Sequence, residues 1–216
     1  TRAIEVQDGT VDGWQLVWGA ANSARHYGAE ILTYHAVTKI DTADGAVTAV
    51  HCTDLKRGED VVIETGFVLN CGGPWAGQIA AMAGAHPVDV VPGRGIMIAM
   101  NHRLVNRVVN RCIYPADGDI LVPVHTVSII GTTDVKVDDP DHLAIEPDEV
   151  QQMLDAGEVL IPGFRNSRAL HAWAGARPLI KDNRVAAADT RLMSRGMAVI
   201  DHTERDGLDG MLTIGG

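Results

Sequence analysis

Apolar residues between Gly13 and Tyr27 predict an α-helix near the start of the chain. Asp12 stands at its N-cap position, and Gln15 follows three residues later, where a capping box requires Glu or Gln. Gly28 comes next, at a position where a left-handed residue favours helix termination. Most faces of this segment are apolar, which is typical of a buried helix, so we expect it to be well covered.

Polar and apolar positions then alternate in three short segments, which predict a small antiparallel meander. These segments are 37–40, 47–52 and 61–63. Asp44-Gly45 lies between the first two and Lys56-Arg57-Gly58 between the last two, at the places where hairpins need turns.

An unbroken apolar run, Phe67-Val68-Leu69, predicts a strand that is covered on both faces. It leads into Asn70-Cys71-Gly72-Gly73-Pro74-Trp75, and Pro74 suits the first turn of a helix that extends to Met82. Backbone N–H groups at such a helix start can bind an anion such as a phosphate. Glycines in strand–helix turns also serve close packing alone, so ligand binding and packing are both open interpretations.

The pattern changes near Pro87, where strand-like runs alternate with turns. The runs cover 88–91, 95–100, 120–123, 127–131, 172–178, 197–202 and 211–214. One helix interrupts them, Pro147 to Leu160, with acidic residues at its start, where the helix dipole favours them. The change near Pro87 predicts two subdomains.

The composition excludes several classes of protein. The chain has 216 residues, a net charge of −10 and 46% hydrophobic residues, which is ample for a folded core. Its apolar runs are far shorter than the roughly 20 residues of a membrane-spanning helix, so no transmembrane segment is expected. The acidic balance argues against nucleic-acid binding, which needs a basic face. Three scattered cysteines indicate a reducing compartment, and nine histidines without metal-ligand spacing predict no metal site.

Arg177 is a second candidate for chemistry because it lies in an otherwise apolar segment with small residues, 173–179. A guanidinium is costly to bury unless a carboxylate or a ligand anion neutralises it. Asp134 or Asp182 could supply that carboxylate, so an ion pair and a ligand contact are both open. Arg195 is a candidate second anion contact or, taken alone, a solvated loop charge.

Several motifs that occur in a fixed order resemble one enzyme family. The segment from Leu69 to Trp75 is similar to the NAtGpW element of FAD-dependent oxidoreductases with the D-amino-acid-oxidase fold. Residues 129–134 and 175–179 are similar to the IGTTD and GvRPL elements of flavin-linked glycerol-3-phosphate dehydrogenases. Further motifs narrow the resemblance to the FAD-bearing large subunits of the anaerobic type; they are Arg111-Cys112, 119–123 and 201–210.

The resemblance implies a mixed α/β (α+β) fold with part of an FAD-binding Rossmann-like domain and an antiparallel-sheet substrate domain of the D-amino-acid-oxidase type. Residues 1–86 would belong to the FAD domain, residues 87–194 to the substrate domain, and residues 195–216 would return to the FAD domain.

The resemblance also implies roles for individual residues. Val37 would meet the adenine through its backbone, and the cofactor's ribose and pyrophosphate would lie near Gly72, Gly73 and Trp75. Arg177 would point at the substrate as a catalytic and binding residue, and Arg195 would hold the substrate phosphate. The closing glycines Gly215 and Gly216 would also lie at the cofactor.

The implied activity is oxidation of sn-glycerol 3-phosphate to dihydroxyacetone phosphate, with hydride transfer to FAD and onward electron transfer to a quinone through partner subunits. The implied location is the cytoplasm, peripheral to the inner face of the cell membrane. An amino-acid or hydroxy-acid oxidase of the same fold, or a binding module without a cofactor, are the alternatives.

Three departures from the family pattern lower the expected activity of the chain by itself. It contains no GxGxxG motif, the lysine of the family's GGKxxTYR element is absent after Gly216, and Met97 stands where aerobic relatives carry a histidine. The chain also starts at Thr1, without an initiator Met. We therefore expect an internal segment of a longer protein that by itself neither retains FAD nor turns over substrate.

Overall fold

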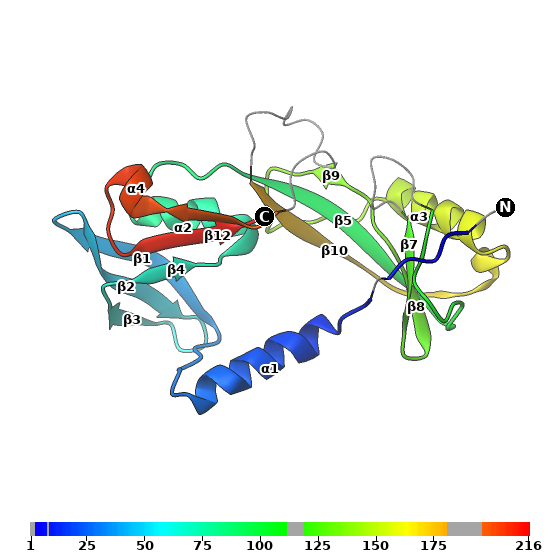
Figure 1. The fold of residues 1–216 in the computed structure, drawn as a ribbon, viewed down its shortest axis with the longest axis horizontal. Helices are drawn as coiled ribbons and strands as arrows, with labels where there is room; N and C mark the ends of the chain where they lie inside the picture. Colours follow the sequence, from blue (N-terminus) through cyan, green and yellow to red (C-terminus); the bar gives the residue numbers. More distant parts are fainter. Residues whose placement is uncertain (1–2, 8, 112–118, 181–195) are drawn as a thin grey trace.

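The structure is a computed structural model that describes residues 3–7, 9–111, 119–180 and 196–216. It contains three separate β-sheets with helices beside them (Figure 1). The mixture of helices and strands agrees with the predicted α/β class.

The first sheet is the predicted meander. Its strands β1 (His35–Ala43), β2 (Ala46–Asp54) and β3 (Glu59–Glu64) pair antiparallel in chain order. Asp44 and Gly45 join the first two with φ values of 51° and 77°, the left-handed pair that a two-residue hairpin turn requires. The alternating pattern and the turn residues therefore predicted this sheet correctly.

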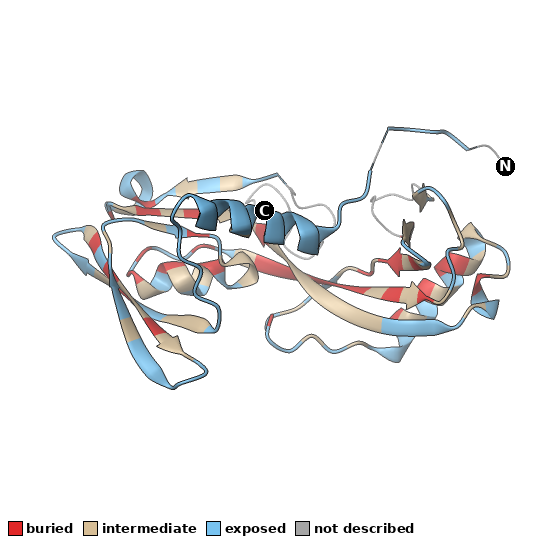
Figure 2. Ribbon diagram, turned by 90° about the horizontal axis from the view of Figure 1, so that it is seen from below, coloured by how far each residue is buried: buried red, intermediate tan, exposed pale blue. Residues whose placement is uncertain are grey.

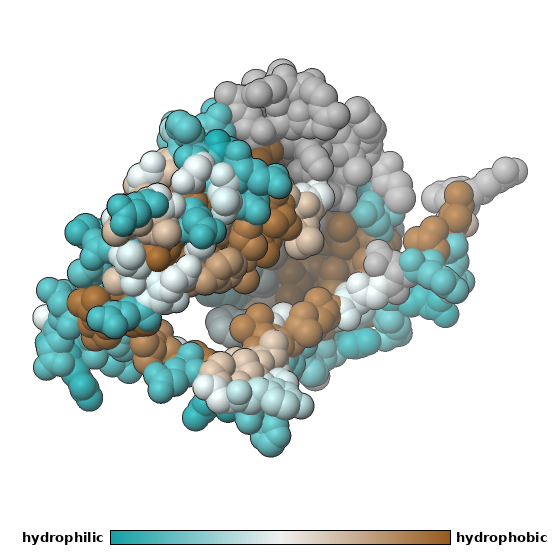
Figure 3. Space-filling view, turned by 60° about the vertical axis from the view of Figure 1, so that its left-hand side comes forward, coloured by the Kyte–Doolittle hydropathy of each residue, from teal (hydrophilic) through white to brown (hydrophobic). Residues whose placement is uncertain are grey.

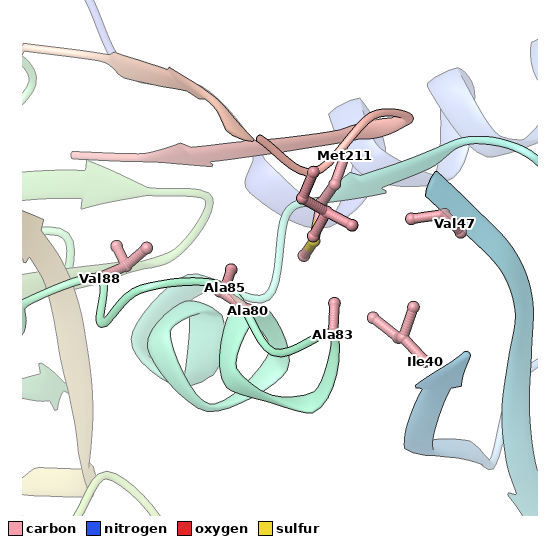
Figure 4. Packing of buried hydrophobic residues seen from close by; sticks show 8 residues of the cluster. Ile40, Val47, Ala80, Ala83, Ala85, Val88 and Met211 are labelled. Atoms are coloured by element: carbon pink, nitrogen blue, oxygen red, sulfur yellow. The ribbon is translucent and has the colours of Figure 1, made fainter. Parts of the chain in front are cut away.

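The second sheet places β12 (Met211–Gly215) between β11 (Ala198–Asp201) and β4 (Val68–Asn70). β12 runs parallel to β4 and antiparallel to β11. The turn after β4 begins as a short 3₁₀ helix, η1 (Gly73–Trp75), and continues as α2 (Ala76–Met82). Figure 4 shows the core formed here, where Ala80 of the helix and Ala83 directly after it lie near Met211 and near Ile40 of the meander.

The expected coverage of both faces of β4 is wrong. Phe67 and Leu69 are each about half exposed, at 54% and 51%, whereas Asn70 is buried. β4 is an edge strand, and Val199 of β11 is exposed as well. Side chains alternate between the two faces of a strand, so one face of this sheet packs on α2 while the other lies open in the part of the chain that the structure describes.

The third and largest sheet has the order β10-β5-β8-β7-β6, with β9 also paired to β5, and every pairing is antiparallel. Its strands are β5 (Val90–Met100), β6 (Val109–Asn110), β7 (Ile120–Val124), β8 (Val127–Gly131), β9 (Val135–Lys136) and β10 (Ala169–Ile180). The two runs predicted at 88–91 and 95–100 form one continuous strand, β5, because β10 pairs with it along its whole length.

Helix α3 (Pro147–Leu160) has the predicted bounds and packs with the following 3₁₀ turn, η2 (Phe164–Asn166), beside this sheet. Met153 of the helix and Phe164 are buried against Ile96, Ile98 and Ile130 of the strands. The long strands β5 and β10 extend from this core toward the second sheet (Figure 1). The chain enters β5 after the connection that contains Pro87, and the domain division at residues 86 and 194 stays a prediction.

The first helix, α1 (Gly13–His26), forms as predicted but is not buried. The Asp12 carboxylate accepts a hydrogen bond from the Gln15 N–H at 3.1 Å, and Gly28 has a φ of 93° beyond the helix end. Nevertheless no residue of this helix is buried (Figure 2). Trp14 is 89% exposed. Apolar side chains at the molecular surface are also visible in Figure 3. Helix propensity and caps act locally, whereas burial needs a neighbouring element, and within the described residues none covers α1.

One short helix departs from the predicted last strands. The run predicted at 197–202 ends at Asp201, and His202 begins α4 (His202–Asp206). The Asp201 carboxylate caps this helix by accepting a hydrogen bond from the Thr203 N–H at 2.8 Å.

Candidate active site

Arg177 lies on β10 opposite Gly93 of β5. Its side chain extends across β5, because a Cβ atom on Gly95 would come within 2.9 Å of Arg177 Nη2 and 2.8 Å of the Thr133 carbonyl oxygen. Gly93 and Gly95 occupy the same face of β5, since side chains alternate along a strand. The two glycines thus provide a flat floor over which the guanidinium reaches the segment beyond β5.

That segment, Thr132 to Asp134, holds the guanidinium. Asp134 Oδ1 lies 3.1 Å from Arg177 Nη1, the Thr132 hydroxyl accepts from Nη2, and the Gly93 and Thr133 carbonyls lie 3.5 Å from Nη1. The Asp134 side chain is 4% exposed, whereas the Arg177 side chain is 25% exposed. The structure therefore contains the ion pair that the sequence left open, with part of the arginine still accessible. Asp182 and Arg195 lie outside the described residues.

A second arginine lies on the opposite face of β5, and sequence reasoning missed it. Arg94 is buried, and its Nη2 donates to Glu149 Oε2 of α3 while its Nη1 donates to the Ala144 carbonyl at 2.5 Å. The other Glu149 oxygen accepts from the Thr133 hydroxyl at 2.8 Å, and Thr133 Oγ1 accepts from the Ile96 N–H at 3.1 Å. The available sequence signals were an arginine between two glycines and a glutamate near the start of a predicted helix.

The glycine turn divides into a packed residue and an open one. A Cβ atom on Gly72 would collide with Ile79 Cδ1, which supports the packing interpretation for that position. Gly73 has a φ of 56°, and its Cβ would meet nothing within 4 Å. The left-handed backbone and the open space make Gly73 the position of this turn that a ligand could approach closely.

Trp75 joins this turn to the large sheet. Its indole Nε1–H donates to Asp141 Oδ1 at 3.0 Å, in the connection after β9, and η1 packs against β10 and β5. Gly216 also reaches β10, because its N–H donates to the Pro178 carbonyl at 3.0 Å, and a Cβ on Gly215 would meet Ile180 at 2.7 Å. The turn, the closing glycines and Arg177 are therefore gathered around one half of β10.

Val37 lies apart from this grouping. It is half-buried in β1, beside a bulge in the pairing with β2, and packs on the core cluster that includes Ala80. Contact of its backbone with an adenine stays a prediction.

Met97 and Trp173 pair across β5 and β10 on the face that carries Arg177. The Trp173 ring stacks on His171, with 5.7 Å between ring centroids. His171 is six residues from Arg177 along the strand, or about 20 Å at the usual rise per residue, which is too far for a direct partnership. Met97 therefore lies on this face, where aerobic relatives carry a histidine. His171 is too distant from Arg177 to replace that histidine.

A buried polar chain supports the glycine turn from below. The Asn70 amide donates to the Ala76 carbonyl at 2.8 Å and to Thr213 Oγ1 at 3.1 Å, and its oxygen accepts from the Gly72 N–H at 3.1 Å. His202 continues the chain, with Nε2 2.8 Å from Thr213 Oγ1. This series of hydrogen-bonded side chains extends from the turn into the core between β4 and β12.

Asp206 is the last member of this series of hydrogen-bonded side chains. It accepts from Nδ1 of the buried His202 and, at 2.6 Å, from His86. Burial favours the neutral acid, but the hydrogen bonds from His202 and His86 and the nearby charge of Arg205 outweigh it, so the pKa of Asp206 lies below 3.8. The carboxylate is therefore held in its charged form at neutral pH.

No group of three or more His, Cys, Asp or Glu side chains is arranged to hold a metal ion in the described parts of the chain. Among the described helices, none has the length and apolar character needed to cross a membrane.

Comparison with known proteins gives one consistent family. Residues 1–215 match the DAO family, described as FAD dependent oxidoreductase. One subunit of the anaerobic glycerol-3-phosphate dehydrogenase of Escherichia coli K12 is 38% identical over 216 residues, covering 99% of this chain and 39% of that protein. Its counterpart from Haloferax volcanii is 38% identical over 224 residues, covering 100% of this chain and 38% of the relative. The chain therefore spans well under half the length of these relatives.

Solved structures agree on the fold. A glycerol-3-phosphate dehydrogenase from Bacillus halodurans complexed with FAD matches with a TM-score of 0.73 at 20% identity, over 94% of this chain and 38% of that one. Glycine oxidase from Bacillus cereus matches with a TM-score of 0.69 at 18% identity, over 93% of this chain and 49% of that one. The predicted D-amino-acid-oxidase type of fold is thereby confirmed.

Proposed function

Because this chain belongs to the DAO family of FAD-dependent oxidoreductases, we propose that it forms part of a longer dehydrogenase that oxidises sn-glycerol 3-phosphate to dihydroxyacetone phosphate. The 38% identity to glycerol-3-phosphate dehydrogenase subunits over essentially the whole chain supports this substrate. The single observation that carries the proposal is the position of Arg177, which is partly exposed over Gly95 and lies on β10, the strand that the glycine turn packs against.

Two open glycine positions support the proposal that the described residues contact FAD. A Cβ atom on Gly175 of β10 would meet nothing within 4 Å, and the same holds for Gly73 in the turn. Gly175 faces the same side of the sheet as Arg177, because the two residues are two positions apart. An open, glycine-lined face suits a flat ring system, and an open turn suits backbone contact with a ribose or phosphate. We propose Val37, Gly72, Gly73, Trp75, Gly215 and Gly216 as the residues of this chain that lie at the cofactor.

Arg177 binds and orients the substrate in this proposal. A guanidinium stays protonated and presents planar donors that suit phosphate or a developing alkoxide. Asp134 and Thr132 hold its terminal nitrogens in place, so little side-chain freedom is lost when substrate binds. The bound FAD supplies the acceptor for the hydride from carbon 2 of the substrate. Arg195 is proposed as the second contact to the substrate phosphate.

The longer protein would pass electrons to a quinone through partner subunits, in the cytoplasm at the inner face of the cell membrane. The identity to subunits named as parts of an anaerobic dehydrogenase supports partner subunits. The charge of −10 gives no support for nucleic-acid binding.

An amino-acid or hydroxy-acid oxidase is the competing function, because a single partly exposed arginine such as Arg177 is sufficient to bind a carboxylate substrate. The test uses the longer flavoprotein, with reduction of a quinone analogue as the readout. We expect turnover of sn-glycerol 3-phosphate and at least ~10²-fold lower kcat/KM for glycerol, which lacks the phosphate. Preferential oxidation of amino or hydroxy acids would favour the competing function, and a protein that binds no flavin would favour a binding module.

A further inference from the structure

The two faces of β5 carry two different arginines, and one short segment touches both. On one face the buried Arg94 points toward α3, together with Ile96 and Ile98 of the apolar core. On the other face the guanidinium of Arg177 lies over Gly93 and Gly95. Alternation along the strand separates the two groups, so any coupling between them has to pass around β5.

Thr133 provides that connection. Its hydroxyl donates to Glu149 at 2.8 Å on the α3 side, and its carbonyl lies 3.5 Å from Arg177 Nη1 on the other side. Its chain neighbours Thr132 and Asp134 supply the hydroxyl and carboxylate that hold the same guanidinium. A shift of Thr133 would therefore move every described side-chain partner of Arg177 together.

Glu149 is itself fixed from several directions. One oxygen accepts from Arg94 Nη2 and, at 3.3 Å, from the Glu146 N–H, while the other accepts from Thr133. Arg94, Glu149 and Thr133 are 7%, 8% and 2% exposed. Buried, mutually bonded polar groups are costly to separate, because a partner left alone loses its neutralisation in a medium of low dielectric constant.

We propose that the buried pair Arg94–Glu149 acts through Thr133 as a positioning device for Arg177, and this inference rests on the proposed function. An incoming phosphate competes with Asp134 for the guanidinium, and a loop free to shift would let Arg177 follow either partner. Anchoring the loop from the far face keeps the guanidinium in one direction while the substrate binds. Misplacement of a binding group by about 1 Å is enough to slow catalysis substantially.

The test replaces the Thr133 hydroxyl in the longer flavoprotein. Thr133→Val keeps the shape and removes the hydroxyl that donates to Glu149 and accepts from the Ile96 N–H, whereas Thr133→Ser keeps both hydrogen bonds. We expect Thr133→Val to lower kcat/KM for sn-glycerol 3-phosphate at least ~10-fold, mainly through KM, with unchanged flavin content. Thr133→Ser should restore most of the loss.

Ile98→Val is the matched control, because Ile98 is buried in the same core and makes no side-chain hydrogen bond. If Thr133 has only a structural role, Thr133→Val and Ile98→Val should both lower the thermal stability and should have the same KM. Equal KM values in these two variants, or failure of Thr133→Ser to restore KM, would overturn the inference.

A second readout separates this inference from the proposed function. Side-chain ¹⁵N NMR of Arg177 in the same purified protein reports how tightly its Nη groups are held, without any substrate. We expect the Arg177 guanidinium to rotate slowly in the unsubstituted longer flavoprotein and faster in its Thr133→Val variant. If the unsubstituted longer flavoprotein does not oxidise sn-glycerol 3-phosphate, the proposed function is wrong. Unchanged rotation of the Arg177 guanidinium in Thr133→Val would contradict the positioning role, whether or not the protein oxidises sn-glycerol 3-phosphate.

Discussion

The Asp134 carboxylate lies 3.1 Å from the Arg177 guanidinium although the strand β5 separates their backbones. The contact exists because Gly95 has no side chain at the crossing point. It neutralises an arginine that would otherwise be expensive to place in an apolar strand, and it also fixes the direction of that arginine.

Arg177→Ala in the longer flavoprotein should lower kcat/KM for sn-glycerol 3-phosphate at least ~10²-fold, a magnitude typical of losing one charge stabiliser. Arg177→Lys should recover little, since an ammonium lacks the planar fork. Steady-state kinetics measures both. Arg57→Ala, on the exposed turn of the meander, is the control and should leave the rate unchanged. Wild-type kinetics in Arg177→Ala would remove this residue from the site.

Gly95→Ala should destabilise the chain by about 1–3 kcal/mol, the usual cost of overpacking. The new Cβ would lie 2.8 Å from the Thr133 carbonyl and 2.9 Å from Arg177 Nη2, so the loop or the arginine has to move. Gly175→Ala is the matched control on the neighbouring strand, where a Cβ meets nothing within 4 Å. Chemical denaturation of both variants gives the comparison, and equal stabilities would contradict the described crossing.

Trp75→Phe should cost about 0.5–1.5 kcal/mol, because it removes the indole N–H that donates to Asp141 and keeps an aromatic ring. Asp141→Ala should cost a similar amount, and the double variant should cost little more than either single change. A double-mutant cycle from urea unfolding measures this coupling. Strictly additive costs would show that the contact does not link the turn to the large sheet.

Acidification should destabilise the chain through Asp206. Its folded-state pKa is depressed, so its contribution is complete above the unfolded pKa and is lost as the pH falls below 3.8 toward the folded value. Asp206→Asn should therefore lower stability at neutral pH and weaken the further loss on acidification. Asp138→Asn, at an exposed position, is the control. Thermal unfolding between pH 7 and pH 3 is the measurement, and parallel curves for Asp206→Asn and the parent would reject the assignment.

The 216-residue chain expressed alone should show no flavin absorbance after purification. It contains no GxGxxG motif, the element with which a Rossmann-type fold holds the pyrophosphate of a dinucleotide. Absorbance near 450 nm, compared with the protein concentration, gives the occupancy. Stoichiometric flavin would mean that the glycine turn and the face around Arg177 are sufficient to bind it.

The sequence by itself determined the features that depend on neighbouring residues. Asp12 and Gln15 specified the start of α1, Asp44-Gly45 specified a hairpin, and the acidic start of 147–160 marked α3. These signals work because caps and turns act over three or four residues. The ordered motifs also identified the family, which the match over residues 1–215 confirmed.

Only the tertiary structure decided which distant groups meet. The register of β10 on β5 placed the Arg177 guanidinium over Gly95 and beside Asp134, a contact that the sequence could only offer as one possibility. The link from Arg94 through Glu149 to Thr133 joins three segments that are far apart in the chain. The exposure of α1 was likewise not encoded in its own pattern, because an apolar face specifies what a helix can bury and a neighbouring element decides whether it does.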